Sequence, residues 1–382
     1  MNRRPSALTF ARSRRVRADR FARQRLISGW DQNRLRRAPI LVVGAGAIGN
    51  EVLKNLALLG FGTVHILDPD RIAESNLSRG VLFRAGDVGR AKAAVAAAAC
   101  RRLFPGGRFT WSRETFRCWA SLPRLRTFAA VVAATDNFES RLQLNRLCRL
   151  APVDLFNAAV DARLACVESF PFRRDAGAAC YECALPSSVH AEARARHSCA
   201  GLRRPVGIPR AVPASVVTAA HAGAGLAAAV LRGLREDFSG ACRQLIDTFE
   251  PLGSSVVALA RSPACPACSG PLPVARVSCG PNIAALPRGW STGALSDLLL
   301  AEPVVLGGVC VGCGRRRRSW TRADERAEAW RDCARCGRGT VRLDVRDQLA
   351  PAELEALPGA ARWPVPYASF ARADGTVLLE FS

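Results

Sequence analysis

Eight of the 15 cysteines in this 382-residue chain fall in four C-x-x-C pairs, a spacing that directs two thiolates at one metal ion. The pairs are Cys180 with Cys183, Cys265 with Cys268, Cys310 with Cys313, and Cys333 with Cys336. Because structural zinc is held by four ligands in a tetrahedron, two pairs complete one site. The last two pairs are separated by 19 residues, as in a zinc ribbon. We predict two zinc sites per chain, although the spacing alone leaves an exchange of partners open.

A second group of residues has the types and spacing of a nucleotide site. Gly44, Gly46 and Gly49 form a G-x-G-x-x-G motif between an apolar, β-branched segment and a helical one. Such glycines let the backbone approach a phosphate chain, and the helix N-terminus after them attracts its negative charge. Asp68 follows Gly49 by 19 residues, where an acidic residue binds ribose hydroxyls. These features fit a nicotinamide dehydrogenase and an ATP-dependent adenylyltransferase equally well.

The residues beyond Asp68 favour the adenylyltransferase. Asn76 and Arg79 place an amide and a guanidinium just past the ribose carboxylate, and Lys92 adds an ammonium at the start of a helix. A triphosphate requires several cations, which Arg and Lys side chains supply. Asp136, at the end of a predicted strand, is placed to hold Mg²⁺ against the phosphates. Lys92 is one of only two lysines in the chain, which indicates that arginine does not replace it there.

One of the cysteines outside the C-x-x-C pairs differs from the rest. Cys199 lies in a polar segment with arginines at positions 194, 196, 203 and 204. Nearby cations lower the pKa of a thiol and favour the nucleophilic thiolate. We take Cys199 as the candidate acceptor of an activated acyl group, with a residue of a covering loop as the alternative. The other six are expected to be small buried hydrophobic residues: Cys100, Cys118, Cys148, Cys166, Cys242 and Cys279.

The elements that must position these residues alternate between strands and helices. Apolar segments at 39–44, 63–67 and 129–134 predict three buried strands, and helical spacing at 50–59 predicts a helix after the first. A long buried helix is expected over 212–234. This alternation predicts an α/β fold with a Rossmann-like, doubly wound, mainly parallel sheet and right-handed crossovers.

The combined motifs resemble the ThiF/MoeB/ubiquitin-activating enzyme superfamily. The similarity runs from about Arg20 to Cys268 and rests on the segments RFARQ, GWDQNRL, VVGAGAIGNEVLKNLALLGFGTVHILDPDRIAESNLSRG, GRAKA and ATDNFESR. It implies an adenylation domain whose loop Gly44, Gly46, Ala47 and Gly49 contacts the nucleotide. Ala47 stands where the family often has glycine, and because that position acts through its backbone we expect little effect.

The resemblance also implies roles for individual side chains. Asp68 would bind ribose; Asn76, Arg79 and Lys92 would contact the triphosphate; and Asp136 would serve the metal. Dimeric members use an arginine of the neighbouring subunit. Arg23 matches it, so a homodimer is expected.

Two further implications concern cysteines. Sulfur-carrier-activating members pair two distant C-x-x-C motifs on one structural zinc, which here joins Cys180 and Cys183 to Cys265 and Cys268. The family often carries a Ser-Cys-Ala segment like the one around Cys199. In some members that cysteine takes the acyl group as a thioester or persulfide, and in others it is dispensable.

The function implied is ATP-dependent adenylation of the C-terminal carboxylate of a ubiquitin-like or sulfur-carrier protein ending in Gly-Gly. The carboxylate attacks the α-phosphate of ATP, giving an acyl-adenylate and pyrophosphate. A conjugating enzyme or a sulfurtransferase would act next. The alternatives are sulfur-carrier activation for molybdopterin or thiamine synthesis without a thioester, adenylation of tRNA or a precursor peptide, and a non-enzymatic module with a degenerate nucleotide site.

Composition sets the remaining expectations. The net charge of +23 predicts a surface that attracts an acidic protein or a polyanion, and the run Arg315 to Arg318 is either a solvated face or such a contact. No uninterrupted apolar stretch suits a membrane span, and reduced cysteines favour the cytoplasm. We divide the chain into a basic N-terminal arm (1–19), an adenylation domain (20–290) and a zinc-ribbon-containing C-terminal region (291–382).

Overall fold

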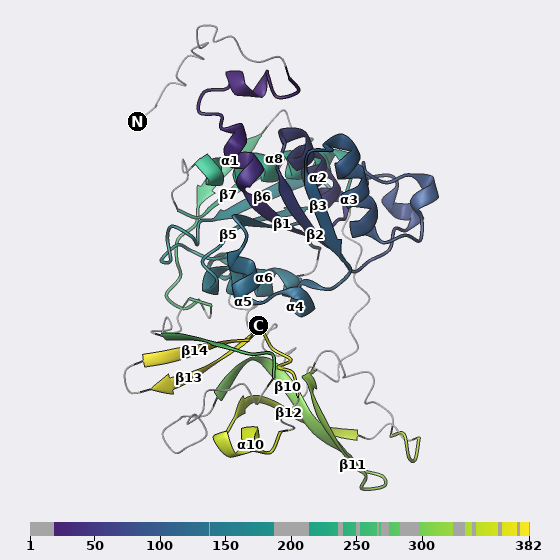
Figure 1. Cartoon of the computed structure of the whole chain (residues 1–382), viewed down its shortest axis with the longest axis vertical. Helices are drawn as coiled ribbons and strands as arrows, with labels where there is room; N and C mark the ends of the chain where they lie inside the picture. The colour runs from purple at the N-terminus through teal and green to yellow at the C-terminus, as the bar shows by residue number, and fades with distance from the viewer. Residues whose placement is uncertain are drawn as a thin grey trace.

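Two β-sheets, one above the other in Figure 1, organise the computed structural model of this chain. The residues that it describes are 19–136, 138–186, 214–235, 240–249, 253–265, 267–268, 275–282, 298–323, 333–337, 341–357, 361–372 and 375–381.

The first sheet begins with five parallel strands in the order β3-β2-β1-β4-β5. Their bounds are β1 (Pro39–Val43), β2 (Thr63–Leu67), β3 (Arg108–Ser112), β4 (Ala130–Ala133) and β5 (Asp154–Val160). The order reverses direction between β1 and β4, which is the place where nucleotides bind in open α/β sheets. The predicted mainly parallel, doubly wound α/β fold is thus confirmed.

Three antiparallel strands extend this sheet beyond β5. They are β6 (Leu164–Phe170), β7 (Cys242–Asp247) and β8 (Ser254–Ala258), each paired with its predecessor. The sequence analysis did not predict these strands. Strands β7 and β8 are less buried than β1, β4 and β5, so their hydrophobic pattern is weaker, whereas β6 is as buried as β5.

Helices cover both faces of the first sheet (Figure 1). One layer holds α2 (Ala47–Leu59), α3 (Lys92–Leu103) and α8 (Val216–Arg235), and the other holds α4 (Phe116–Trp119), α5 (Leu122–Arg126) and α6 (Phe138–Leu150). Successive strand residues point to opposite faces. Ile40 and Val42 therefore join the core under α2, whereas Leu41 and Val43 join the core under α6.

Helix α8 is long and apolar enough to cross a membrane by length and composition, with a mean hydropathy of 1.3. Half of that window is buried inside the protein. Leu226 and Val230 are fully buried in the core with α2, as in the core helix of a globular domain. The expected long buried helix is present, and it gives only weak support for a membrane span.

The second sheet has the strand order β11-β10-β13-β14-β9, with β12 also paired to β10. Its elements are β9 (Ala275–Cys279), β10 (Leu298–Cys310), β11 (Arg316–Arg322), β12 (Val341–Leu349), α10 (Pro351–Glu355), β13 (Tyr367–Arg372) and β14 (Gly375–Phe381). Strand β9 precedes residue 290 but pairs with β14, in parallel. The division at residue 290 itself stays a prediction.

Buried ion pairs join the second sheet to the α4–α6 layer. Glu380 of β14 is 1% exposed and receives a two-pronged hydrogen bond from Arg126 of α5. Glu302 of β10 accepts from Arg117 of α4 at 3.3 Å and from Gln143 of α6. Removing one member of such a pair leaves a buried charge unpaired, so these contacts fix how the sheet is placed.

Candidate active site and cysteine clusters

The loop after β1 packs so tightly that its glycines are required. Gly44 has a φ of +99°, and a Cβ there would lie 2.4 Å from the carbonyl oxygen of Ala134. A Cβ on Gly49 would lie 2.1 Å from the carbonyl oxygen of Gly44. Gly46, which caps α2 without a side-chain bond, has open space around it. The first turn of α2, from Ala47, thus directs backbone N–H groups at a space that a phosphate can enter.

Asp68 lies at the end of β2 and is 5% exposed. Its carboxylate accepts the N–H of Ala45 at 2.7 Å and the N–H of Asp70 at 2.9 Å. Burial raises the pKa of Asp68, while these two hydrogen bonds oppose the shift. Each carboxylate oxygen has a second lone pair, so the group can also accept hydrogen bonds from a ribose.

The side chains predicted to contact the phosphates lie beyond Asp68 in the sequence. Lys92 is the first residue of α3, and its ammonium lies 2.8 Å from the carboxylate of Asp70. Arg79 donates to the carbonyl oxygen of Ser75 at 2.7 Å. The side-chain oxygen of Asn76 accepts the N–H of Ala73 and so closes the short helix η2 (Glu74–Asn76).

Asn50 ties this segment to the glycine loop, and the sequence analysis did not single it out. It is fully buried in α2 and donates to the carbonyl oxygens of Ala45 (2.7 Å) and Gly46 (3.0 Å). Its own oxygen accepts the N–H of Leu82 at 2.9 Å. Asn50 therefore holds the loop and the Arg79 segment in one arrangement. A polar residue at a fully buried position of an otherwise apolar helix face is the signal that could have found it.

Asp136 follows β4 and is exposed. Because Gly44 packs on the end of β4, at Ala134 and Thr135, Asp136 lies at the same edge of the sheet as the glycine loop. The structure therefore brings the loop, Asp68 and Asp136 to the carboxyl ends of β1, β2 and β4, and Lys92 joins them through Asp70.

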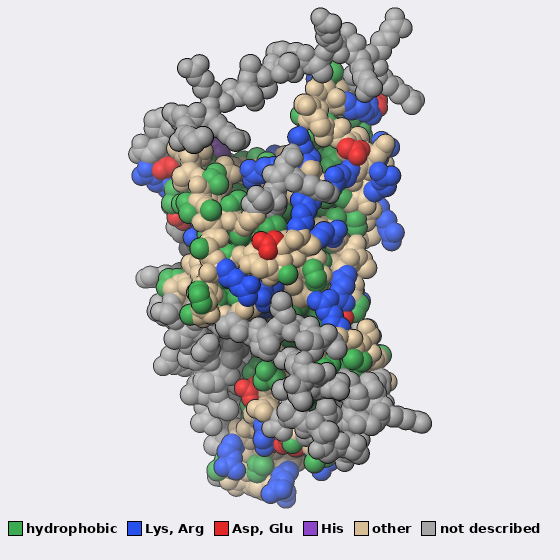
Figure 2. All heavy atoms as spheres, turned by 90° about the vertical axis from the view of Figure 1, so that its left-hand side faces the viewer, with side chains coloured by type: hydrophobic (Ala, Val, Ile, Leu, Met, Phe, Trp, Pro, Cys, Tyr) green, Lys and Arg blue, Asp and Glu red, His purple; other side chains and the backbone are tan. Residues whose placement is uncertain are grey.

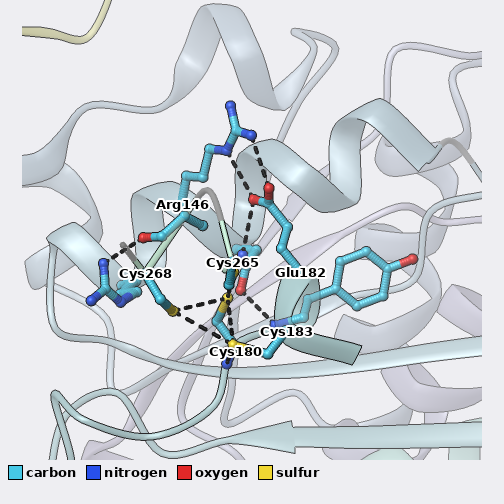
Figure 3. Close-up of polar contacts among 10 residues, drawn as sticks. Arg146, Cys180, Glu182, Cys183, Cys265 and Cys268 are labelled. Atoms are coloured by element: carbon cyan, nitrogen blue, oxygen red, sulfur yellow. Dashed lines mark hydrogen bonds and ion pairs between the residues drawn. The ribbon is translucent and has the colours of Figure 1, made fainter. Parts of the chain in front are cut away.

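The first cysteine cluster lies beneath α6 (Figure 3) and contains Cys180, Cys183, Cys265 and Cys268. Its sulfur atoms are 3.4 to 3.8 Å apart in the pairs that touch. A tetrahedral zinc with bonds of about 2.3 Å holds its sulfurs about 3.8 Å apart, so the donor set and spacing fit this metal. The two distant C-x-x-C pairs thus meet in one cluster.

Charged and polar side chains hold the first cluster in place. Glu182, 1% exposed, lies between Cys180 and Cys183 in sequence and receives two hydrogen bonds of 2.8 Å from Arg146 of α6 (Figure 3). Asn145, also buried, donates to Glu182 and accepts the N–H of Tyr181 at 2.9 Å. Such outer contacts orient metal ligands.

The second cluster, Cys310, Cys313, Cys333 and Cys336, lies at the far end of β10. Sulfur distances of 3.6 Å join Cys310 to Cys336 and Cys313 to Cys333. A glycine follows each C-x-x-C pair, Gly314 with φ +67° and Gly337 with φ +65°, and each donates its N–H to the first cysteine's carbonyl oxygen. The two half-sites therefore share one turn geometry, and their four thiols also fit tetrahedral zinc.

The comparisons with known proteins agree with this geometry. A sequence profile of the ThiF family matches residues 19–280. The chain belongs to the ThiF family. It is 34% identical over 174 residues to a sulfur carrier protein adenylyltransferase of Thermus thermophilus, which covers 44% of this chain and 64% of that protein.

Other relatives share shorter segments or only the fold. The SUMO-activating enzyme subunit uba-2 of Caenorhabditis elegans is 40% identical over 113 residues, covering 29% of this chain and 19% of that protein. The chain thus spans less than two thirds of the length of these relatives. The crystal structure of E. coli MccB with ATP has a TM-score of 0.52 at 22% identity, covering 67% of this chain and 76% of that one.

In this ThiF-family chain, Arg23 lies away from its own glycine loop. The segment around it packs at the opposite end of α2, where Gln24 bonds to the carbonyl oxygen of Leu58 and Arg20 to that of Leu103. Helix α2 has 13 residues, which makes it about 20 Å long. Arg23 is exposed there, at the end of the helix away from the glycine loop of its own chain.

Cys199 lies outside the described residues, between the short helix η4 (Tyr181–Ala184) and α8. The pKa shifts of three other thiols indicate how reactive they are. Burial, aided by nearby Glu168, raises the pKa of Cys166 to about 11. Burial also raises the pKa of Cys279, and it raises that of Cys100 to about 12. These three thiols remain protonated near neutral pH and are weak nucleophiles.

Proposed function

We propose that this chain is an ATP-dependent adenylyltransferase that activates the C-terminal carboxylate of a ubiquitin-like or sulfur-carrier protein. The observation that carries the proposal is the joining of the glycine loop, Asp68 and Asp136 at one sheet edge, with Lys92 linked to them through Asp70, in a chain of the ThiF family. The relatives named sulfur carrier adenylyltransferase and SUMO-activating enzyme favour a small protein as the substrate.

The chemistry needs positioning more than proton transfer. The carboxylate is ionised near neutral pH, so it attacks the α-phosphate of ATP without a general base. A new oxygen–phosphorus bond forms, the bond to pyrophosphate breaks, and the acyl group gains AMP as a leaving group. The backbone N–H groups of α2 would hold the phosphates, with Arg79 and Lys92 facing the charge that moves onto pyrophosphate. Asp136 would hold Mg²⁺, which neutralises that charge.

Lys92 needs a rearrangement to take this role, because its ammonium now pairs with Asp70. Asp70 is largely exposed, with a side-chain exposure of 65%. The Lys92 side chain is only 13% exposed, but solvent reaches the pair through Asp70, so we expect a triphosphate to displace it. Asp70 then acts as the resting partner of the lysine.

Pyrophosphate exchange into ATP, measured with and without a carrier protein, tests the proposal. Lys92→Gln and Asp136→Asn should abolish exchange while the protein stays folded. Asp161→Asn is the matched control, because exposed Asp161 caps a turn outside the site. Normal exchange in folded Asp136→Asn protein would refute the metal role. Exchange that depends on a short peptide or on tRNA instead of a carrier would change the substrate.

The finer assignments belong to this proposal as well. We propose a cytoplasmic homodimer in which Arg23 enters the partner's nucleotide site, and one zinc ion in each cysteine cluster. The zinc ions would be structural, because each cluster offers four thiols and leaves no open position for a substrate. A conjugating enzyme or a sulfurtransferase would receive the activated carrier.

Cys199 would accept the acyl group as a thioester, which displaces AMP. Incubation with ATP, Mg²⁺ and the carrier should then give an adduct that thiol reagents cleave. Cys199→Ala should lose the adduct and keep pyrophosphate exchange. An adduct that persists would transfer the role to another thiol. If the unmodified protein forms no adduct but still catalyses pyrophosphate exchange, direct transfer of the activated acyl group to a sulfur donor would be favoured.

A further inference from the structure

Arg149, in the last turn of α6, has donor groups that no described residue satisfies. Its Nη1 donates to the carbonyl oxygen of Ala267, between the two cysteines of one C-x-x-C pair, at 2.6 Å. Its Nε and Nη2 are shielded from solvent, and within the described part of the chain neither has a hydrogen-bond partner. Because a guanidinium keeps its proton near neutral pH, a positive charge is held beside the first cysteine cluster.

The charge of Arg149 differs from that of other arginines in what balances it. On the face drawn in Figure 2, basic side chains lie at the surface, where water and salt screen their charge. Arg146, three residues earlier on α6, pairs with the buried carboxylate of Glu182 (Figure 3). No described carboxylate accepts a hydrogen bond from Arg149. The C-terminal end of α6 offsets only part of this charge, since a helix end carries about half a negative charge.

A metal ion in the first cysteine cluster would bring the missing negative charge. The guanidinium of Arg149 already interacts electrostatically with the thiol of Cys268. A neutral thiol is a weak hydrogen-bond acceptor, which agrees with the unsatisfied donors of Arg149. Zinc binds cysteine as the thiolate, and four thiolates on one zinc ion give the cluster a net negative charge. Buried charges are stable when they are paired, so the guanidinium and a four-thiolate metal would each balance the other.

We propose that Arg149 is the counter-ion of a zinc ion bound by four thiolates in the first cysteine cluster, and that it sets how firmly the cluster holds this metal. The inference rests on the zinc that the proposed function places there. Arg149 is a positioning residue, because it contacts the turn between two ligands and not the metal itself. The spacing of the cysteines gives no indication of this role, since Arg149 lies on a different element from all four.

A simpler role for Arg149 is to hold the turn through the carbonyl oxygen of Ala267, and the chain offers a control for it. Arg261 donates to the carbonyl oxygen of Cys268 in the same turn at 2.9 Å, but Arg261 is exposed. Arg149→Gln removes the charge and keeps an N–H donor for Ala267, whereas Arg149→Lys keeps the charge. A counter-ion role therefore predicts that Lys replaces Arg149 better than Gln does, and a turn-holding role predicts that the two variants behave alike.

Competition for zinc with a chelator of known affinity measures the effect on the full-length protein. All samples carry Cys310→Ser, so that only zinc in the first cluster is counted. Loss of an outer contact of a metal ligand costs about 10- to 100-fold in metal affinity, and Arg149→Gln should weaken zinc binding by about that factor. Arg149→Lys should restore most of the affinity, and Arg261→Gln should leave it unchanged. In cobalt-substituted protein, the sulfur-to-cobalt charge-transfer band of Arg149→Gln should move to longer wavelength, because loss of a nearby positive charge raises the energy of the thiolate electrons.

Equal zinc affinity and an unmoved cobalt band in Arg149→Gln would overturn the proposal. Equal losses in Arg149→Gln and Arg149→Lys, or an equal loss in Arg261→Gln, would also overturn it and would assign Arg149 to holding the turn. If the first cluster of otherwise unmodified protein takes up no metal, both the proposed zinc and its counter-ion are refuted. Pyrophosphate exchange by the zinc-loaded protein tests adenylation separately, and its absence would refute that activity while the zinc affinities still decide the role of Arg149.

Discussion

Asn50→Ala should show whether Asn50 positions the nucleotide site in addition to stabilising the fold. The side chain makes three hydrogen bonds, to Ala45, Gly46 and Leu82, from a fully buried position. The carbonyl oxygen of Gly46 also accepts the N–H of residue 50, so it keeps a partner. The substitution therefore leaves two groups to be satisfied by other means, the carbonyl of Ala45 and the N–H of Leu82.

The magnitude follows from those two groups. A buried backbone group without a partner costs about 1–3 kcal/mol, so the free energy of unfolding should fall by about 2–6 kcal/mol. The loop and the Arg79 segment would also lose their shared tether. Because a displacement of about 1 Å at a reacting group can cost about 10²-fold in rate, we expect pyrophosphate exchange to fall by about that factor.

Asn145→Ala is the matched control, since Asn145 is equally buried and loses bonds to Tyr181 and Glu182 near the first cysteine cluster. Urea denaturation gives the stability of both variants, and exchange at saturating ATP gives their activity. Asn145→Ala should lose stability and zinc but retain exchange per folded molecule. The positioning role of Asn50 is wrong if the two variants are equally destabilised and lose the same share of pyrophosphate exchange. It is also wrong if the Asn50→Ala protein has normal exchange.

Three further expectations concern metal, pH and thiol reactivity. Elemental analysis should find two zinc ions per chain, of which Cys180→Ser loses one and Cys310→Ser the other; one zinc or none in fresh protein would contradict the assignment. Burial, reinforced by Arg124, lowers the pKa of His65 in the folded state, so its contribution to stability is complete above the ordinary value of 6.5 and is lost as the pH falls below it. Replacing His65 with Asn should flatten the decline of unfolding free energy in acid by up to about 1.4 kcal/mol per pH unit, and an unchanged decline would show that other groups cause it. Iodoacetamide should alkylate Cys166 slowly near neutral pH and faster towards pH 11, and mass spectrometry showing rapid neutral labelling would contradict its raised pKa.

Three strands of the parallel half, β1, β2 and β4, were predicted because they are short apolar segments, whereas β3 and β5 were not predicted. Strands such as β1 and β4 are continuous apolar segments, and the glycine motif marks the turn after the first. Strand β8 is exposed at every position, so no apolar alternation distinguishes it. Strands β7 and β8 therefore left little signal in the sequence.

The residues of the candidate site could be predicted where the type of side chain itself indicates the chemistry. Asp68 and Lys92 stand out by charge and position, whereas Asn50 acts through backbone groups of segments that only the folded chain brings together. The strands of the second sheet were not predicted for the same reason. A zinc ribbon was expected, but β10 also pairs with β12 and β13, which lie far from it along the chain.

The pairing of β9 with β14 has a consequence for how the chain folds during synthesis. Ala275 pairs with Val377, so β9 cannot pair until β14 has also left the ribosome. The first sheet ends at residue 258 and can close much earlier. Because domains form in the order of translation, the nucleotide site would assemble while β9 is still an unpaired, aggregation-prone edge. Loss of the seven-residue strand β14 would leave that edge open permanently, and would remove Glu380 from Arg126 as well.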